Sequence, residues 1–205
     1  MNVNAPAQAI SAPTHLLYLH GFRSSPRSFK ALRLQEWLQQ HRPDVTCSCP
    51  QLPPSPLLAL AQVLATLRGW PSGQVAVLGS SLGGFYATVA AEAVGCPAVV
   101  INPAVNPARD LAWHVGMQTG YHDPTQHFEF RPEYVDALRV LTPAALTRRE
   151  RYLALIAKGD ELLDWREMAA RYAGCSLRLV EGSDHGLSDF DEHLPFLLHF
   201  LQLTP

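Results

Sequence analysis

QVAVLGSSLGGFY, at residues 74–86, joins an apolar run to a glycine-rich turn and the start of a helix. The turn, residues 79–83, matches the pattern G-x-S-x-G, in which a strained strand-to-helix turn raises a serine hydroxyl above a sheet. The backbone two residues before and after such a serine passes too close to its neighbours for a Cβ, so Gly79 and Gly83 fit these positions. The stretch therefore predicts a strand, a tight turn that presents Ser81, and a helix.

Strand-like and helix-like segments alternate along the rest of the chain. Short continuous apolar runs predict strands, and apolar residues at near-helical spacing predict helices. The expected strands are residues 16–20, 45–49, 74–78, 98–101, 152–157 and 176–180. The expected helices are residues 28–41, 57–67, 82–94, 165–172 and 195–201. This alternation predicts an α/β fold of three layers, in which a mostly parallel sheet of about six buried strands carries helices on both faces.

Two segments lie outside this alternation. Residues 1–13 have no hydrophobic period, and we expect them to form a loose N-terminal tail. About fifty residues separate Ile101 from the next strand at Tyr152, whereas a few residues usually connect a strand to its helix. We expect the excess, about residues 105–149, to form a small cap inserted into a single domain that spans residues 1–205. The cap is expected to contain a helix at residues 133–140.

Composition argues against several classes of partner. The 205 residues are 47% hydrophobic and 17% charged, as in chains that fold around a core. Sixteen basic and eighteen acidic residues leave a formal net charge of −2 without a basic stripe, so nucleic acid is not an expected partner. Because no apolar run is long enough to span a bilayer and no signal peptide is recognisable, we expect no membrane span and a cytoplasmic location.

Two other residues fit a catalytic arrangement with Ser81. A serine hydroxyl becomes nucleophilic when a base removes its proton, and the base must be oriented by an acid. In folds with this type of turn, the acid and then the histidine follow the serine along the chain. Asp160 follows the expected strand at 152–157, and His185 follows the expected strand at 176–180. Order and position therefore predict Ser81, Asp160 and His185 as the catalytic residues.

Three other carboxylates compete with Asp160 for the role of acid. Asp164 stands three residues before Glu167 at the start of a helix, and a capping box explains it without chemistry. Asp184 is too close to His185 in sequence to turn its carboxylate onto that imidazole. Glu161 stays open as an alternative.

The loop after the first expected strand predicts the site of oxyanion stabilisation. In His20-Gly21-Phe22, we expect the Phe22 N–H to join the Leu82 N–H in an oxyanion hole, with His20 shaping the loop through hydrogen bonds. Asn102 also follows a strand, and the cap brings aromatic side chains near the site. The candidate substrate-binding residues are therefore His20, Asn102, Trp113 and Phe128.

No metal or cofactor site is expected. The cap histidines His114, His122 and His127 lack the acidic spacing of a metal site, and the four cysteines lack C-x-x-C spacing. The glycine-rich turn lacks the Lys-Ser/Thr ending of a phosphate-binding loop, which argues against nucleotide binding.

The motifs together resemble the bacterial YqiA-like esterases, a compact branch of the α/β-hydrolases related to YcfP. The likeness covers residues 16–203 and rests on YLHGF (18–22), SSP (24–26), PQLPP (50–54), GSSLGG (79–84) with YA (86–87), NPAV (102–105), GDE (159–161) and His185. The resemblance implies an α/β-hydrolase fold, esterase activity on acyl esters, and a triad that falls on Ser81, Asp160 and His185. The chain departs from the family pattern at Asn106, where the family has arginine, and at Gly186-Leu187, where it has Ala-Phe.

The resulting hypothesis is a serine esterase that hydrolyses small acyl esters through an acyl-enzyme, without a cofactor. An acyl-CoA thioesterase or an acyltransferase would use the same triad, so these stay open as alternatives. A binding module that keeps the fold without catalysis is a further alternative, because fold alone does not fix function. The sequence leaves acyl length and oligomeric state open.

Overall fold

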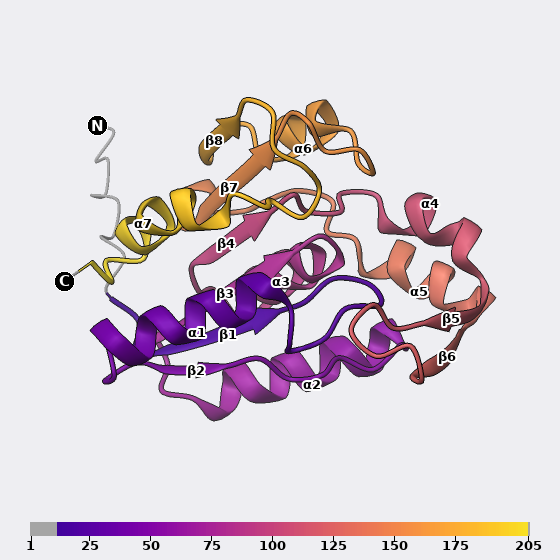
Figure 1. The fold of residues 1–205 in the computed structure, drawn as a ribbon, viewed down its shortest axis with the longest axis horizontal. Coiled ribbons are helices and arrows are strands. Elements are labelled where there is room, and N and C mark those ends of the chain that lie inside the picture. Colours follow the sequence, from indigo (N-terminus) through magenta and orange to yellow (C-terminus); the bar gives the residue numbers. More distant parts are fainter. Residues whose placement is uncertain (1–11, 205) are drawn as a thin grey trace, which may run out of the picture.

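A six-stranded parallel sheet forms the centre of the molecule. The computed structural model describes residues 12–204, and every neighbouring pair of strands in this sheet is parallel. In spatial order the strands are β2 (Thr46–Ser48), β1 (His15–Leu19), β3 (Val75–Ser80), β4 (Ala98–Ile101), β7 (Tyr152–Ala157) and β8 (Ser176–Val180). Their carboxyl ends point to the same edge, on the right in Figure 1.

Helices cover both faces of this sheet (Figure 1). On one face lie α1 (Phe29–His41) and α7 (Phe190–Phe200). On the other face lie α2 (Pro56–Gly69), α3 (Leu82–Val94) and α6 (Trp165–Arg171). The predicted three-layer α/β fold is therefore confirmed.

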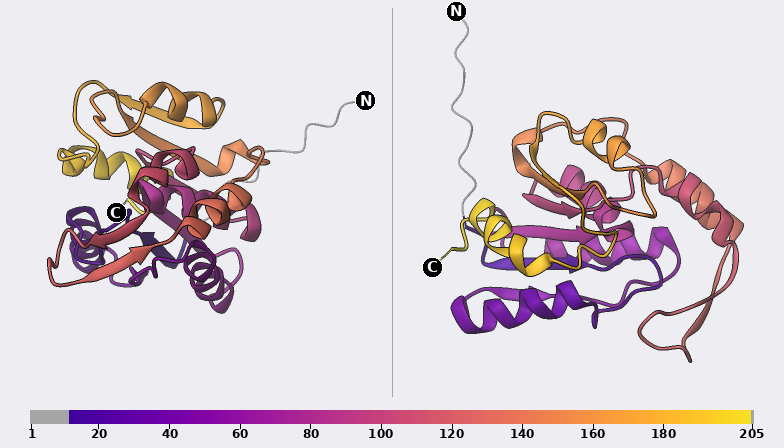
Figure 2. Two further views of the ribbon diagram at one scale, coloured as in Figure 1. Left: turned by 90° about the vertical axis from the view of Figure 1, so that its right-hand side faces the viewer. Right: turned by 45° about the horizontal axis from the view of Figure 1, so that its top comes forward.

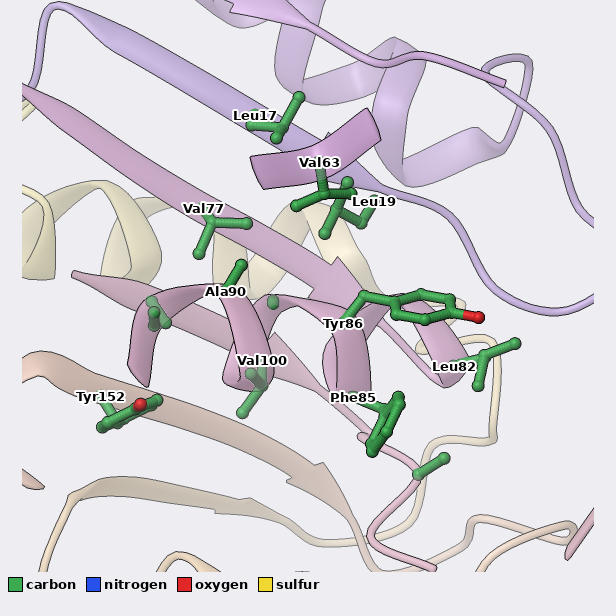
Figure 3. Packing of buried hydrophobic residues seen from close by; sticks show 14 of the residues in the cluster. Leu17, Leu19, Val63, Val77, Leu82, Phe85, Tyr86, Ala90, Val100 and Tyr152 are labelled. Carbon is green, nitrogen blue, oxygen red and sulfur yellow. The ribbon is translucent and has the colours of Figure 1, made fainter. Parts of the chain in front are cut away.

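The inner strands β1, β3, β4 and β7 are almost entirely apolar because both of their faces are covered. In β1, Leu17 and Leu19 pack toward α2 and α3, whereas Leu16 and Tyr18 pack toward α1 and α7. Successive side chains of a strand point to opposite faces, so a strand with two covered faces needs apolar residues at both sets of positions. Figure 3 shows the α2 and α3 side of this core, where Leu17 and Leu19 lie with Val63 of α2. This packing explains the continuous apolar runs in the sequence.

Two expectations about the C-terminal elements are wrong. The strand at 176–180 was expected to be buried, but β8 is one of the two edge strands, and Leu177 and Leu179 are each 37% exposed. The last helix was expected to begin at Pro195, but α7 begins at Phe190 and contains Pro195 in its interior. Its buried positions Phe190, Leu194 and Leu197 follow helical spacing, and burial of this stripe outweighs the effect of the proline.

The expected N-terminal tail is described only at its end. Residues 1–11 lie outside the described part of the chain, so the expectation for them stays a prediction. Pro13 is buried, which is contrary to a loose tail up to that residue, and Thr14 begins hydrogen bonding to the sheet through Gln74.

The segment expected to form a cap (residues 105–149) contains helices and a β-hairpin. Its elements are α4 (Pro107–Leu111), η1 (Ala112–His114), β5 (Gly116–Thr119), β6 (His127–Phe130), α5 (Pro132–Leu141) and the start of η2 (Arg149–Arg151). β5 and β6 pair antiparallel, and the hairpin reaches out beyond the carboxyl edge of the sheet (Figure 2). Arg23, in the loop after β1, donates from Nε to the Thr119 carbonyl at 2.6 Å and accepts from the Tyr121 N–H at 2.8 Å. The hairpin is thereby fixed to the loop after β1.

Candidate active site

Ser81 lies at a sharp turn between β3 and α3. Its backbone has φ 57° and ψ −122°, a conformation that costs energy for a residue with a side chain. A methyl group on Gly79 would stand 2.1 Å from the Gly83 carbonyl oxygen, and one on Gly83 would stand 2.0 Å from the Leu19 carbonyl oxygen. Both contacts are impossible, so the steric explanation of the two glycines is confirmed.

A chain of two hydrogen bonds links Ser81 to His185 and His185 to Asp160. The Ser81 Oγ lies 3.0 Å from the His185 Nε2, and the His185 Nδ1 lies 2.8 Å from the Asp160 Oδ2. A carboxylate only accepts, so Nδ1 carries the proton and the lone pair on Nε2 faces the serine hydroxyl. The Asp160 side chain is fully buried, and its Oδ1 accepts from the N–H groups of Leu162 and Leu163. These two backbone hydrogen bonds hold the Asp160 carboxylate in the orientation that contacts the imidazole.

The adjacent strands β7 and β8 bring Asp160 to His185. The Gly159 N–H donates to the Gly182 carbonyl at 2.9 Å, so the loops after the two strands touch. A methyl group on Gly159 would stand 2.2 Å from the Ser183 carbonyl oxygen. Glycine is therefore required before Asp160, a role that the sequence analysis missed although the Gly-Asp pair at a strand end was a visible signal.

Two of the competing acids interact with backbone groups around His185. The Glu161 Oε2 accepts from the His185 backbone N–H at 2.9 Å, and the Asp184 Oδ1 accepts from the Ser188 N–H at 3.0 Å. Neither carboxylate bonds the imidazole in the described structure. Glu161 therefore holds the backbone of the His185 loop, while Asp184 closes a turn after it.

The third competitor, Asp164, caps a helix. It is the N-cap residue of α6, and its side chain accepts from the Arg166 N–H at 2.9 Å. The expected capping box is only half present, because Glu167 pairs with Arg109 of α4 at 2.7 and 2.8 Å. This ion pair ties the cap segment to α6.

Asn102 does not face a substrate, and its interpretation as a substrate-binding residue is wrong. It is fully buried, and its amide donates to the carbonyls of Asp184 and His185 at 3.0 Å each. Its Oδ1 accepts from the Ala157 N–H at 2.8 Å. With all its polar atoms engaged by the protein, Asn102 joins the end of β7 to the His185 loop and acts as a positioning residue.

His20 lines the hollow at Ser81, but both of its ring nitrogens are occupied by backbone groups. Nδ1 donates to the Gly21 carbonyl at 2.9 Å, and Nε2 accepts from the Leu52 N–H at 3.1 Å. Burial is the main cause that lowers the pKa of this imidazole, which keeps Nε2 an acceptor. The ring has no free nitrogen for a polar substrate group, so His20 holds the loop instead, as the sequence analysis also considered.

The loop after β1 lies against Ser81. A methyl group on Gly21 would stand 3.2 Å from the Ser81 Cβ, and Phe22, Ser81 and Leu82 line one hollow. Leu82 is the first residue of α3, where a backbone N–H has no partner within its own helix. Among the described residues the Phe22 N–H also makes no hydrogen bond, so both N–H groups are free beside the serine.

The hollow at Ser81 has a volume of about 460 Å³ and adjoins a second hollow of about 580 Å³. Phe22 and Leu82 line both, and Phe128 lines the second, where it packs edge-on against Phe22 at 5.8 Å between ring centroids. Trp113 lines neither hollow and is 92% exposed. The expectation that Trp113 lies against the substrate is therefore wrong.

Three residues that the sequence analysis did not single out also line the hollow at Ser81. Tyr18 reaches it from β1, and Ser28 and Lys30 reach it from the start of α1. Residues 28–30 were assigned to a helix, and Tyr18 was assigned to a strand and to the motif YLHGF, so no functional role was given to their polar groups. A signal was present, because Lys30 is one of only two lysines in the chain.

The described residues contain neither a cluster suited to a metal ion nor a helix that could span a membrane. Within residues 12–204, no group of three or more His, Cys, Asp or Glu side chains is arranged to hold a metal ion. Across the same residues, each helix is too short or too polar to cross a bilayer.

A parallel sheet with a serine at the turn after one strand, and an aspartate and a histidine after later strands, is the arrangement of an α/β-hydrolase. Solved structures agree on this fold. One of them comes from work on LipS and LipT, two metagenome-derived lipolytic enzymes. It has a TM-score of 0.71 and 17% identity to this chain, with 96% of each chain covered. The chain belongs to the Uncharacterised protein family (UPF0227), whose model matches residues 15–202. This is the family of the YqiA-like and YcfP-like proteins, so the resemblance found in the sequence is confirmed.

Two further structures share the fold at similar distance. Alpha/beta hydrolase domain-containing protein 10 from mouse has a TM-score of 0.67 and 16% identity, covering 90% of this chain and 87% of its own. Est1E from Butyrivibrio proteoclasticus has a TM-score of 0.65 and 16% identity, covering 95% of this chain and 87% of its own.

Proposed function

We propose that this protein is a serine esterase that hydrolyses carboxylic esters through an acyl-enzyme. The observation that carries the proposal is the chain of hydrogen bonds from the Ser81 Oγ to His185 at 3.0 Å and from His185 to Asp160 at 2.8 Å. These distances lie within the range at which a base can take a proton from a nucleophile.

The first half of the reaction forms the acyl-enzyme. The Ser81 Oγ attacks the ester carbonyl carbon while the His185 Nε2 takes the hydroxyl proton. Asp160 fixes the imidazole tautomer and stabilises the imidazolium through the hydrogen bond to Nδ1. When the tetrahedral intermediate collapses, the bond to the alcohol oxygen breaks, and His185 returns the proton to the leaving alcohol.

The second half repeats these steps with water. His185 takes a proton from water, the hydroxide attacks the acyl carbon, and the proton returns to the Ser81 Oγ as the carboxylic acid leaves. In both halves the negative charge develops on the carbonyl oxygen. We assign its stabilisation to the N–H groups of Phe22 and Leu82, because both residues line the hollow at Ser81.

The second hollow offers a place for the acyl chain. Phe22 and Leu82 line both hollows, so a chain bound to Ser81 can extend toward Phe128. Contact with this apolar wall would favour longer acyl groups by about 0.8 kcal/mol for each buried methylene. In this proposal the cap segment sets chain-length preference through Phe128.

The comparisons support ester hydrolysis as the reaction class. Among the solved structures with this fold are proteins described as lipolytic enzymes, as Est1E, and as an esterase domain from a Rhodothermus marinus protein. A thioester would meet the same nucleophile and base. Turnover rates of esters and acyl-CoA thioesters with the same acyl group therefore decide which of the two substrate classes the protein prefers.

A fluorophosphonate probe tests the proposal, because it phosphonylates an activated serine. The expected result is labelling of Ser81 in the wild-type protein and no labelling in Ser81→Ala, whose kcat falls about 10⁶-fold as for the nucleophile of a serine protease. Ser80→Ala is the matched control, because Ser80 is the neighbouring hydroxyl and precedes the turn.

Two outcomes would contradict the proposal. A folded wild-type protein that resists the probe and turns over neither esters nor thioesters would favour a binding module. Labelling that persists in Ser81→Ala and disappears in Ser80→Ala would place the nucleophile one residue earlier.

A further inference from the structure

The hollow at Ser81 contains buried hydroxyl groups that the proposed reaction does not use. Tyr18 is 1% exposed, and its Oη lies beside the hydroxyls of Ser28 and Ser80 but makes no hydrogen bond of good distance and angle within the described residues. The Ser28 Oγ is likewise buried without a well-formed hydrogen bond there, and all three residues line the hollow. Buried hydroxyls that lack well-formed hydrogen bonds are costly, so two of them at one wall indicate a site that a polar ligand group completes.

The same wall contains the N-terminus of α1. Ser28 is the N-cap residue of this 13-residue helix, but its side chain makes no capping hydrogen bond, and the first turn contains no acidic residue. The first N–H groups of a helix lack partners within it, and the helix dipole places partial positive charge there. An anion near Ser28 would meet these groups directly.

Lys30 adds a full positive charge at this wall. Its Nζ donates to the Gly186 carbonyl, and it forms no salt bridge with any described carboxylate. Burial lowers the pKa of Lys30 to about 8, although Asp184 and Asp160 favour its charged form. By contrast Asp110, which also lines the hollow, is paired with Arg109 at 2.8 Å. Lys30 therefore brings a positive charge to the hollow that no described carboxylate contacts within salt-bridge distance.

We propose that Tyr18, Ser28, Lys30 and the N-terminus of α1 form a binding site for a carboxylate, and that the ester substrate carries this carboxylate near its scissile bond. Hydroxyls, helix N–H groups and an ammonium all donate, and a carboxylate accepts from several donors at once. Lys30 provides one positive charge, and Asp160 and Asp184 are two negative charges nearby, so a singly charged carboxylate is repelled less than a doubly charged phosphate monoester. The substrate class rests on the proposed esterase function, whereas the binding site itself does not.

The kinetic test compares esters that differ only in the charged group. Monoethyl esters of dicarboxylic acids from succinate to pimelate are compared with the corresponding ethyl ester carboxamides by ethanol release. Acetate esters of glycolate and 3-hydroxypropionate, with their amides, test a carboxylate on the alcohol side by acetate release. For at least one pair, kcat/KM for the carboxylate is expected to exceed that for the carboxamide by tenfold or more, as charge-assisted hydrogen bonds allow.

Variants connect this preference to the wall. Tyr18→Phe removes only a hydroxyl that makes no well-formed hydrogen bond, so the fold is retained, and the ratio of carboxylate to carboxamide kcat/KM is expected to fall severalfold. Lys30→Met should abolish the preference and Lys30→Arg should keep part of it, which a purely structural role for the contact with Gly186 would not predict. Lys158→Met is the matched control, because Lys158 pairs with Glu181 outside the hollow and should leave the ratio unchanged.

A second measurement does not depend on catalysis. Because the chain contains two lysines, protein labelled with ¹³C at lysine Cε gives one NMR signal for Lys30 and one for Lys158. Titration of Ser81→Ala with glutarate or adipate is expected to shift the Lys30 signal and raise its pKa, while Lys158 and titrations with the diamides show no change.

The two measurements separate the two hypotheses. Lys30 shifts without any ester turnover would retain the carboxylate site and reject the esterase. Equal kcat/KM for every acid and amide pair, together with a Lys30 signal that glutarate and adipate do not move, would reject the carboxylate site even if esters are hydrolysed.

Discussion

Replacement of Asn102 by alanine tests how the His185 loop is held. The native amide donates to the carbonyls of Asp184 and His185 and accepts from the Ala157 N–H, and Asn102 itself is fully buried. Alanine would leave one backbone donor and two backbone acceptors without these partners. The loop that presents the imidazole would then be free to move away from β7.

The expected cost follows from these contacts. Three hydrogen bonds, one buried and two part-buried, at about 1 kcal/mol each give about 3 kcal/mol. Asn102 also has φ 41°, a left-handed conformation that asparagine tolerates better than alanine, which adds about 1 kcal/mol. Asn102→Ala should therefore lower the free energy of unfolding by about 4 kcal/mol, a large part of the 5–15 kcal/mol of a typical domain.

Urea denaturation and the rate of fluorophosphonate labelling measure the two consequences. The labelling rate should fall in the folded variant, because a shifted imidazole no longer activates Ser81. Asn106→Ala is the control, since Asn106 lies in the same loop but is exposed and makes no side-chain cap bond to α4. If Asn102→Ala is no less stable than Asn106→Ala and is labelled at the wild-type rate, the positioning role is wrong.

Three further predictions follow from the site. Asp160→Asn keeps an acceptor for the N–H groups of Leu162 and Leu163 but loses the charge that selects the imidazole tautomer, so kcat should fall about 10⁴-fold. The control Asp164→Asn keeps an equally good helix cap and should have little effect on kcat. Similar kcat values for the two variants would place the catalytic acid elsewhere. Phe128→Ala should reduce the ratio of kcat/KM between acyl esters that differ by one methylene by up to about fourfold. The control Trp113→Ala replaces an exposed side chain and should leave this ratio unchanged. If Phe128→Ala lowers Tm but leaves the ratio constant, the role of Phe128 is purely structural. Because the pKa of Lys30 is lowered to about 8, the ammonium is present below that pH, and the preference for carboxylate esters should decline as pH rises through about 8. Other titratable groups line this hollow, namely Tyr18, His20, Asp110, His114, Tyr121, His122 and His185, and Asp160 and Asp184 lie near Lys30. Lys30→Arg stays charged and should keep its preference to higher pH, so the same decline in that variant would assign it to another group.

The sequence predicted the sheet and the placement of the triad residues because both depend on local patterns. A strand buried on both faces must be apolar at every position, which marks β3, β4 and β7 without ambiguity. The carboxyl ends of parallel strands meet at one edge, so polar residues that follow these runs are brought together by topology alone. The triad roles themselves stay a prediction until the serine is probed.

The partners of individual polar atoms could not be predicted in this way. His20 and Asn102 both follow strands, as Asp160 does, and the sequence gives them the same positional signal. What distinguishes them is whether their polar atoms are already engaged by backbone groups, such as Leu52 for His20 and Ala157 for Asn102. These partners are far apart in sequence, and they meet only through the order of the strands in the sheet.

The misplacement of Trp113 has a local explanation that depends on the turn in which it lies. The chain passes from α4 into η1, and Leu111 and His114 both line the hollow at Ser81. Residues three apart lie on one face of a 3₁₀ turn, so a residue between them points to another side. His114 also packs against Phe22 at 5.4 Å between ring centroids, which fixes this orientation. Trp113 is consequently turned to solvent, and its size alone gave no information about the face on which it lies. The cap segment can therefore influence the substrate through Leu111, His114 and Phe128, while an exposed Trp113 offers a surface that is independent of the hollow.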